Sequence, residues 1–351
     1  MSVFKPFHTP HDEAFGLINK APLRDMNTQG CFCINMRTGN IIFDLPRPLQ
    51  RAQRCDKLKE KREAKTVKNN KKKAVVLSVA GLLSLMMLWT IWGNTALEIS
   101  AYTVTADRLP EAFDGYRIAH ISDLHNATFG KENSRLLELL RKTEPDIIAI
   151  TGDLLDSRNA DVAIALAFAE QAMAIAPCYY VPGNHESRVG EYERLKEGLI
   201  SLGVTVLEGA KISLDRGEER ICVAGVSDPS FQTGYPDGED EAVMNGMLRQ
   251  LGGNPGFTIL LSHRPELMNV YAKYGVDLVL SGHAHGGQFR LPFIGGLVAP
   301  NQGFFPEYDA GLYRENGTQM VVSRGIGKSI IPLRFNNRPE IVLIQLKHKD
   351  A

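Results

Sequence analysis

The sequence predicts an α/β layered domain with largely parallel strand pairing, preceded by one transmembrane helix. Three observations carry this prediction. Residues 97–351 alternate short apolar runs with helical segments, which is typical of layered α/β folds. The apolar runs are nearly continuous, as expected for strands covered on both faces. Residues 74–92 form an uncharged apolar stretch of the length that spans a bilayer.

The elements follow one another in a regular order. Runs such as DIIAIT and FTILLS are short and rich in β-branched or aromatic residues, as in strands. Strands are expected at residues 97–104 (an edge strand), 116–122, 146–151, 178–181, 204–207, 221–226, 257–262, 277–281, 320–323 and 340–346. The intervening segments are longer, and one is rich in Ala, the best helix former. Helices are expected at residues 131–142, 160–176, 191–202, 239–251 and 266–274.

The apolar stretch predicts a membrane anchor over residues 74–93. No charge occurs from Ala74 to Leu97, and Trp89 and Trp92 lie at the far end, where aromatic side chains favour the bilayer interface. The alternatives are a buried core helix, which rarely lacks polar residues on every face, and a cleaved signal peptide, which has a shorter apolar region. Lysines at residues 71–73 adjoin the near end. The positive-inside rule therefore places residues 1–73 in the cytoplasm and the body outside it, in a single-pass protein of the cell membrane.

The formal net charge of zero hides a segregation of charge. Residues 1–73 hold 16 Lys/Arg and 7 Asp/Glu, whereas the remainder holds 24 and 33. A basic head suits an anionic membrane surface, and an acidic body without a recognised motif argues against a nucleic-acid partner. Residues 1–50 lack sustained periodicity and are expected to be poorly ordered. Residues 51–73 are expected to form a solvated charged helix or tail.

The five cysteines form no CxxC pair, so neither a disulfide framework nor a zinc knuckle is expected. Cys178 and Cys222 lie in apolar, strand-like runs. We expect both to be buried core thiols.

Polar motifs follow five of the predicted strands. They are Asp123-Leu124-His125, Gly152-Asp153-Leu154-Leu155-Asp156, Gly183-Asn184-His185-Glu186, the single His263, and Gly282-His283-Ala284-His285. In α/β sheets, ligands bind outside the carboxyl ends of the strands. Each motif alone has an ordinary explanation, such as a turn or a core histidine, but their order and shared position favour one joint site. His120 lies inside a strand on the opposite face and is expected to be structural.

The donor set of this joint site favours two divalent metal ions. Carboxylate, imidazole and amide groups without thiolates suit Mn²⁺, the first choice, or Fe or Zn²⁺. Three or four ligands satisfy one Zn²⁺, and at least seven candidates are present. Two ions about 3.5–4 Å apart with a bridging carboxylate could clamp a phosphoryl group. The sequence therefore predicts a two-metal hydrolytic site.

These motifs resemble the calcineurin-like metallophosphoesterases, whose pattern is D-x-H, G-D-x-x-D, G-N-H-[DE], H and G-H-x-H. All five blocks occur in order between Asp123 and His285. The resemblance implies a metal-dependent phosphoric ester hydrolase. It also implies a four-layer α/β/β/α sandwich with two facing mixed sheets over residues 97–351. The segments ISDLHNATFG, SGHAHGGQ and SRGIG are similar to the membrane-anchored bacterial phosphodiesterases of this superfamily.

The resemblance also implies a role for each residue of the site. One metal would be held by Asp123, His125, Asp153 and His285. The other would be held by Asp153, Asn184, His263 and His283, with Asp153 bridging. His185 would act as general acid toward the leaving group or stabilise the phosphoryl charge, and Asp156 would orient and polarise it.

The substrate expected from the resemblance is a lipid-linked or envelope phosphoester, because the branch is similar to hydrolases that cleave UDP-diacylglucosamine. A nucleotide phosphoesterase and a non-catalytic metal-bound interaction module are the alternatives. In the related protein phosphatases GDxxD is followed directly by Arg, whereas here Ser157 precedes Arg158, which argues against a phosphoprotein substrate. The aromatic-rich stretch 286–324 could wall a substrate cleft, touch acyl chains or be an ordinary packed loop. The oligomeric state is left open.

Overall fold

The computed structural model describes residues 31–34, 41–44, 47–233, 239–328 and 333–349. The chain divides into two compact units, residues 1–82 and 83–351. In the first, β1 (Cys31–Ile34) pairs antiparallel with β2 (Ile41–Asp44). These two strands lie in a range that was expected to lack regular structure, and both are short runs rich in residues that favour strands. For residues 1–30, 35–40 and 45–46, the expectation of poor order concerns residues that the structure does not describe.

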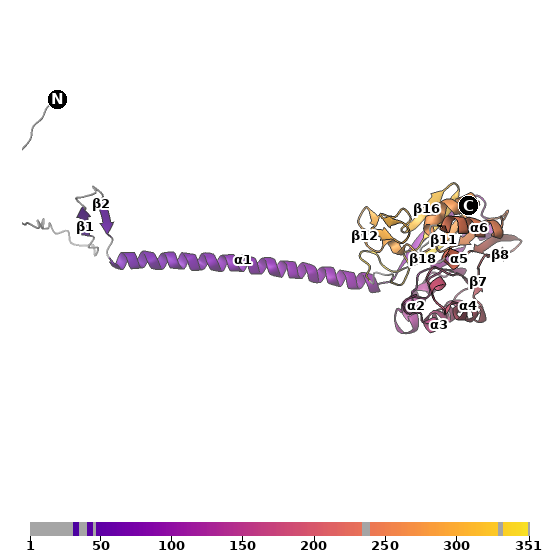
Figure 1. Cartoon of the computed structure of the whole chain (residues 1–351), viewed down its shortest axis with the longest axis horizontal. Coiled ribbons are helices and arrows are strands. Elements are labelled where there is room, and N and C mark those ends of the chain that lie inside the picture. The colour runs from indigo at the N-terminus through magenta and orange to yellow at the C-terminus, as the bar shows by residue number, and fades with distance from the viewer. Residues whose placement is uncertain (1–30, 35–40, 45–46, 234–238, 329–332, 350–351) are drawn as a thin grey trace, which may run out of the picture. The chain divides into compact units, whose positions relative to one another are not determined.

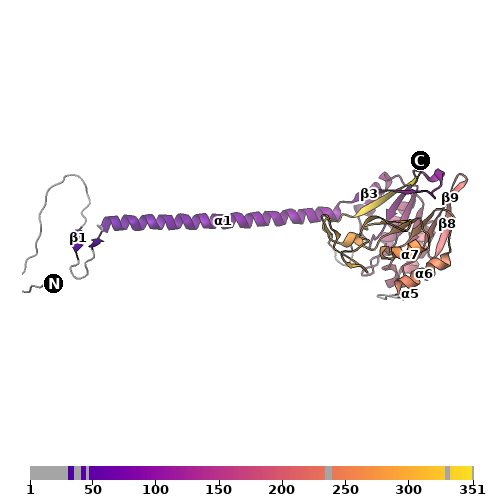
Figure 2. The ribbon, with the colours of Figure 1, turned by 90° about the horizontal axis from the view of Figure 1, so that it is seen from above.

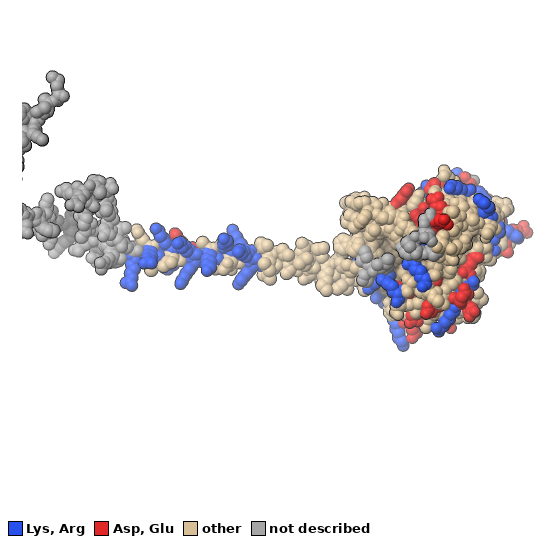
Figure 3. Space-filling model, in the orientation of Figure 1, with Lys and Arg blue, Asp and Glu red and all other residues tan. Residues whose placement is uncertain are grey.

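The helix α1 (Arg47–Thr95) runs without a break from the basic segment through the apolar segment (Figures 1 and 2). Figure 3 shows Lys and Arg side chains along its first part and none along its last part. The helical alternative for residues 51–73 is therefore confirmed. By length and composition, the helical segment 51–95 contains a stretch that is apolar enough to cross a membrane. No residue in the most apolar 18-residue stretch of this segment is buried. A buried core helix is thus not what the structure contains here.

The second unit contains two six-stranded mixed sheets. The first sheet has the order β3 (Glu98–Ala106), β18 (Glu340–His348), β4 (Arg117–Ile121), β5 (Ile147–Thr151), β6 (Cys178–Val181) and β7 (Thr205–Val206). The second has the order β16 (Gly311–Glu315), β17 (Thr318–Val322), β11 (Leu278–Ser281), β10 (Thr258–Leu261), β9 (Glu219–Gly225) and β8 (Ala210–Arg216). Strands β4 to β7 are mutually parallel, as are β9, β10, β11 and β17. The antiparallel partners are β18 with β4, β16 with β17, and β8 with β9.

Helices cover the outer face of each sheet, so the unit has four layers, α/β/β/α. The first sheet is covered by α2 (Ser134–Lys142), α3 (Val162–Met173) and α4 (Tyr192–Ser201). The second is covered by α6 (Asp240–Leu251) and α7 (Met268–Lys273), and the short α5 (Ser230–Thr233) precedes α6. The four-layer sandwich expected from the resemblance is confirmed.

The hydrophobic core is divided among the three interfaces between these layers. In β5, Ile147 points into the cluster between the sheets and Ile148 into the cluster under the helices. In β10, Ile259 and Leu260 alternate in the same way. Successive residues of a strand face opposite sides, so a sheet buried on both faces needs apolar residues at every position. This explains why the strands appear in the sequence as continuous apolar runs.

In the second unit, the strands that the sequence did not predict lie at edges and in loops. They are β8, β16 and the two-residue strands β12 (Arg290–Leu291), β13 (Gly295–Gly296), β14 (Val298–Ala299) and β15 (Gly303–Phe304). β8 reads AKISLDR and has no buried residue. An edge strand of this kind carries polar side chains that protect it from further pairing, so its sequence lacks the apolar run that marks the central strands.

Candidate metal centre

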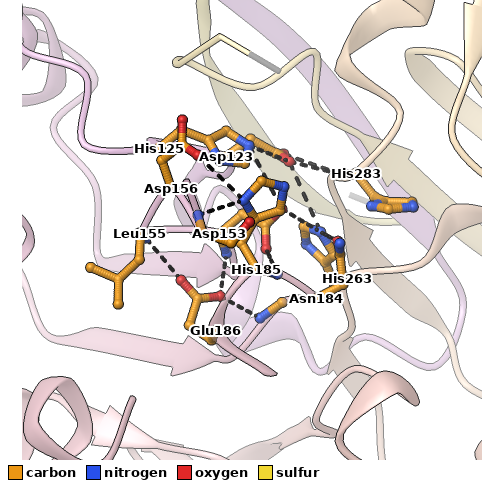
Figure 4. Close-up of polar contacts among 12 residues, drawn as sticks. Asp123, His125, Asp153, Leu155, Asp156, Asn184, His185, Glu186, His263 and His283 are labelled. Carbon is orange, nitrogen blue, oxygen red and sulfur yellow. Dashed lines mark hydrogen bonds and ion pairs between the residues drawn. The ribbon is translucent and has the colours of Figure 1, made fainter. Parts of the chain in front are cut away.

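The five polar motifs come together at the carboxyl ends of the parallel strands (Figure 4). The first three motifs follow β4, β5 and β6 of one sheet, and the last two follow β10 and β11 of the other. Because the two sheets face each other, ligands from both reach one place. All seven predicted metal ligands are buried there, although their side chains are ionisable or strongly polar. They are Asp123, His125, Asp153, Asn184, His263, His283 and His285.

The backbone of this site is strained. Five candidate ligands have left-handed φ angles: Asp123 (53°), His125 (45°), Asp153 (54°), His283 (62°) and His285 (48°). Such conformations cost about 1–3 kcal/mol each and cluster at functional sites, where the surrounding structure holds them in place.

Glycines before the ligands allow the loops to approach closely. A Cβ on Gly152, whose φ is 89°, would lie 2.5 Å from the backbone nitrogen of Gly183. A Cβ on Gly282 would overlap the side chains of Ser122 and Asp123. Glycine, which has no Cβ, permits this close approach of the backbone.

One group of candidate ligands contains Asp123, His125 and His285, whose ligand atoms lie within 4.8 Å of one another. Oδ1 of Asp123 is 3.2 Å from Nε2 of His285 and 3.8 Å from Nε2 of His125. The two Nε2 atoms are 3.1 Å apart. Two imidazole nitrogens and a carboxylate oxygen at these distances form a set that could hold a divalent cation.

A second group contains Asp153, His263 and His283, again within 4.8 Å. Oδ2 of Asp153 lies 3.2 Å from Nε2 of His263 and 3.6 Å from Nε2 of His125, so it faces both groups. The amide oxygen of Asn184 is 3.2 Å from Nε2 of His263. One carboxylate between two groups of donors is the arrangement that a bridged pair of ions requires.

The outer hydrogen bonds of two histidines leave the other ring nitrogen of each available to a metal ion. Nδ1 of His263 lies 2.6 Å from the carbonyl oxygen of Thr151, which can only accept, so Nδ1 carries the proton and Nε2 is free toward Asp153. Nε2 of His283 lies 3.1 Å from the side-chain oxygen of Asn301, which leaves Nδ1 free. Metal-binding histidines are commonly oriented in this way, so the residues present fit a metal centre.

The charge balance of the centre points to a cation as well. Burial by itself would raise the pKa of Asp123 and Asp153, but neighbouring histidines hold both well below the usual value. Burial alone would lower the pKa of His263, yet the charge of Asp153 and its neighbours raises it to about 10. Without metal, protons on histidine therefore balance the carboxylates. A divalent cation would replace those protons, as metal binding generally does.

His185 lies at the edge of the centre, 4.0 Å from Oδ2 of Asp153. The backbone N–H of Ser157 donates to its Nδ1 over 3.0 Å. A neutral imidazole has one N–H and one acceptor nitrogen, so its proton is on Nε2, the atom that faces Asp153. Burial lowers the pKa of His185, against the opposing charge of Asp153.

Asp156 lies close to His185 but does not hydrogen-bond with it. Its Oδ1 is 3.9 Å from Nδ1 of His185, beyond the range of a hydrogen bond. The carboxylate instead accepts from Arg158, with Nε at 2.9 Å and Nη2 at 2.6 Å. Burial would raise the pKa of Asp156, but Arg158 lowers it to about 2. At 3.9 Å the carboxylate stays near the ring, while the hydrogen bond to Nδ1 comes from a backbone donor.

Glu186 holds two of the ligand loops together. It is fully buried, and its two oxygens accept from the backbone N–H groups of Asp153, Leu155 and Gly183 over 2.8–2.9 Å. Burial and the charge of Asp153 raise its pKa to about 7. The sequence placed Glu186 in the motif without a role, and the structure shows it as the residue that fixes the loop of Asp153.

Several residues that surround the centre were missed by sequence reasoning. They are Asn301, which contacts His283; Arg334, whose Nη2 is 3.4 Å from Nδ1 of His285; and the buried pair Arg264–Asp228. Asn301 follows a short loop strand, and Arg334 is isolated in the sequence. Of these residues, Arg264 alone lies next to one of the five motifs, directly after His263, so its position in the sequence could have indicated a role. His120, by contrast, hydrogen-bonds with Thr151 over 2.7 Å, as expected for a structural histidine.

Comparison with known proteins agrees with this geometry. The model of the family described as calcineurin-like phosphoesterase matches residues 116–287. The Uncharacterized metallophosphoesterase YkuE of Bacillus subtilis (strain 168) is 32% identical over 258 residues, covering 72% of this chain and 86% of the relative. Phosphodiesterase YaeI of Escherichia coli (strain K12) is 29% identical over 242 residues, covering 66% and 82%.

A further relative carries a membrane description. The Transmembrane protein with metallophosphoesterase domain of Danio rerio is 33% identical over 256 residues, covering 70% of this chain and 56% of the relative, so this chain spans little more than half of it. Together with the fold and the joined motifs, these findings identify the family. The chain belongs to the calcineurin-like phosphoesterases and is a metal-dependent hydrolase of phosphoric esters.

Proposed function

We propose that this chain is a membrane-anchored phosphodiesterase with two divalent metal ions and a lipid-linked or envelope phosphoester substrate. The observation that carries the proposal is the position of Asp153, whose Oδ2 faces His125 on one side and His263 on the other. A carboxylate so placed can bridge two ions. A sugar–diphosphate lipid of the UDP-diacylglucosamine type is the substrate class we expect.

In this proposal the two ions divide the ligands. One is held by Asp123, His125, Asp153 and His285, and the other by Asp153, Asn184, His263 and His283. Mn²⁺ suits this mixture of carboxylate, imidazole and amide donors, with Fe and Zn²⁺ as alternatives. When bound, such a pair polarises the phosphoryl oxygens and activates water.

His185 is the group we assign to proton transfer. Its Nε2–H faces the centre because Ser157 donates to Nδ1. A general acid needs its proton on the side of the leaving oxygen, and this hydrogen bond supports that tautomer. Asp156 would act indirectly, by holding Arg158 beside the centre.

The domain organisation we propose has three parts. Residues 1–73 form a cytoplasmic head, residues 74–93 the anchor, and residues 97–351 an extracytoplasmic catalytic domain. The lysines at residues 71–73 support this orientation through the positive-inside rule. The relatives described as transmembrane proteins support the anchor.

Exposed aromatic side chains support a substrate at a membrane. Phe293, Phe304 and Phe305 lie on the loops around β12 to β15 and are 108%, 74% and 62% exposed. These loops connect to the end of α1 through Leu333–Asn337: Phe289 forms a bridge with Phe335, and Asn94 pairs with the backbone of Arg334. Exposed apolar groups rimmed by polar residues mark protein or membrane contacts. Of the roles considered for the aromatic-rich stretch 286–324, we therefore propose contact with the acyl chains of the substrate.

The test is turnover of bis-p-nitrophenyl phosphate by the purified full chain loaded with Mn²⁺. We expect hydrolysis that is lost with a chelator and restored by the metal. No turnover from protein that is confirmed to hold metal would contradict the enzymatic proposal. Adding a lipid-linked diphosphate, a nucleotide and a phosphopeptide as competing substrates would rank the substrate classes.

A further inference from the structure

A cavity of about 480 Å³ connects the metal centre with the last residues of α1. Its lining includes His125 and Asp156 of the candidate site and also Asn94 and Thr95 of α1. All four residues belong to the second compact unit. The cavity therefore adjoins both the place where the phosphoester would react and the residues that follow the proposed anchor.

Positive charges outnumber negative ones in the lining of the cavity. Arg135, Arg158, Lys328 and Arg334 contribute to its wall, against the single carboxylate of Asp156. A cleft lined by one sign of charge attracts ions of the opposite sign, and guanidinium groups match phosphate oxygens in bidentate geometry. The lining chemistry thus suits an anion with phosphate-like oxygens.

Two of these cations are available for such an anion. Lys328 is exposed and makes no ion pair with any residue that the structure describes. The guanidinium of Arg135 is exposed and, among the described residues, donates only to the carbonyl oxygen of Thr95, over 3.2 Å. Neither cation is neutralised by a described carboxylate. By contrast, Arg158 is paired with Asp156, and Arg334 donates to backbone carbonyls.

Contacts fix the end of α1 against the catalytic domain. The Asn94 amide donates to the carbonyl of Arg334 over 2.7 Å and accepts from its N–H over 2.9 Å. The guanidinium of Arg338 lies 4.8 Å from the ring of Trp92. Thr95 follows Trp92 by three residues, about 4.5 Å along a helix axis. The cavity wall is thus roughly one helical turn from the proposed membrane boundary.

We propose that this cavity binds a second anionic group of the substrate, the headgroup phosphate of an amphiphile whose apolar part lies toward the bilayer. The inference rests on the proposed function and adds Arg135 and Lys328 as residues that select a diphosphate amphiphile over a simple diester. The reacting phosphate lies at the metal centre, and the second phosphate lies between the centre and the end of α1.

The test measures binding of farnesyl diphosphate, inorganic pyrophosphate and farnesol to the full chain in non-ionic detergent with EDTA. Removal of metal leaves the cavity cations as the anion site. Arg135→Ala/Lys328→Ala should raise the Kd of farnesyl diphosphate about tenfold or more, since a hydrogen bond to a charged group contributes about 1.5–3 kcal/mol. Binding of farnesol should not change. Arg141→Ala, an exposed arginine on the same helix α2, is the matched control and should bind like the native chain.

Each alternative result has a defined meaning. Equal Kd values for farnesyl diphosphate in the double variant and the native chain would overturn the assignment of the cavity. Inorganic pyrophosphate binding as tightly as farnesyl diphosphate would show that a soluble anion is the occupant and would overturn the amphiphile. Turnover of bis-p-nitrophenyl phosphate by the native chain is measured in parallel. Its absence would reject the proposed function, whereas its presence with unchanged binding in the variant would reject this inference alone.

Discussion

The backbone N–H of Ser157 donates a 3.0 Å hydrogen bond to Nδ1 of His185. This single contact decides which ring nitrogen of the neutral histidine carries the proton. The proton is on Nε2, which faces Oδ2 of Asp153 at 4.0 Å. The main chain, rather than the carboxylate of the same motif, therefore sets the tautomer of the ring that we propose as the proton donor.

Replacing His185 should separate chemistry from metal binding. We expect His185→Ala to lower kcat for bis-p-nitrophenyl phosphate by about 10²–10⁴, the usual contribution of general acid catalysis. The metal content should stay at the native value, because His185 is not among the proposed ligands. Kinetics and elemental analysis of the same preparation check both points. Loss of metal together with activity would instead make His185 a ligand.

Glu186 should control metal affinity without contacting metal. Its two oxygens accept three backbone N–H groups around Asp153, and Glu186→Gln replaces one of these oxygens with a donor. Loss of such outer contacts typically weakens metal binding about 10–100-fold. Titration of the metal-free variant with Mn²⁺ measures the effect. Glu138→Gln, an exposed glutamate on α2, is the control and should bind Mn²⁺ normally; equal affinity in both variants would refute this role.

The buried pair Arg264–Asp228 should dominate the stability around His263. Nε and Nη2 of Arg264 lie 2.5 and 2.9 Å from the two oxygens of Asp228, and both side chains are buried. Asp228→Ala leaves Arg264 with the more distant carboxylates of Asp240 and Glu266, 3.2 and 3.3 Å from Nη1, and should cost about 1.5–3 kcal/mol, the contribution of hydrogen bonds to a charged group. Thermal or urea unfolding should show this loss.

The control for that loss is an exposed ion pair. Arg220 and Asp215 are 3.4 Å apart, with side chains 71% and 62% exposed. Arg220→Ala should cost no more than about 1 kcal/mol, because solvent screens such pairs. A similar small loss for Asp228→Ala would mean that the Arg264 network contributes little to stability.

The exposed phenylalanines should matter only for substrates held in a membrane. Phe293→Ser/Phe304→Ser removes two apolar side chains that would each contribute about 1.5–3 kcal/mol if buried in lipid. We expect KM for an alkyl p-nitrophenyl phosphodiester in vesicles to rise at least about tenfold, with little change for soluble bis-p-nitrophenyl phosphate. Ile200→Ser, an exposed apolar residue on α4, is the control. Equal effects of both variants on the vesicle substrate would argue against membrane contact by these loops.

The ligand set could be predicted from sequence because a simple rule links strand ends to sites. Asp123, Asp153 and Asn184 each follow one of the parallel strands β4, β5 and β6 of the first sheet, so their convergence follows from topology. His263 and His283 follow strands of the second sheet. Their proximity to the ligands of the first sheet could be predicted only because the resemblance implied that the two sheets face each other.

The surroundings of the site could not be predicted in this way. Asn301 and Arg334 approach the histidines through long loop connections, and no periodic pattern encodes such approaches. The tautomer of His185 depends on the placement of one backbone N–H, which the G-D-x-x-D motif does not reveal. The edge strand β8 was missed for a related reason, because its environment is solvent rather than a core.

Metal stoichiometry tests the central claim most directly. Elemental analysis of the purified full chain after equilibration with Mn²⁺ should give about two ions per chain. Asp153→Ala removes the carboxylate that faces both groups of ligands, so it should lose bound metal and turnover together. One ion or none in the native chain, or two ions retained by Asp153→Ala, would contradict a dinuclear centre bridged by Asp153.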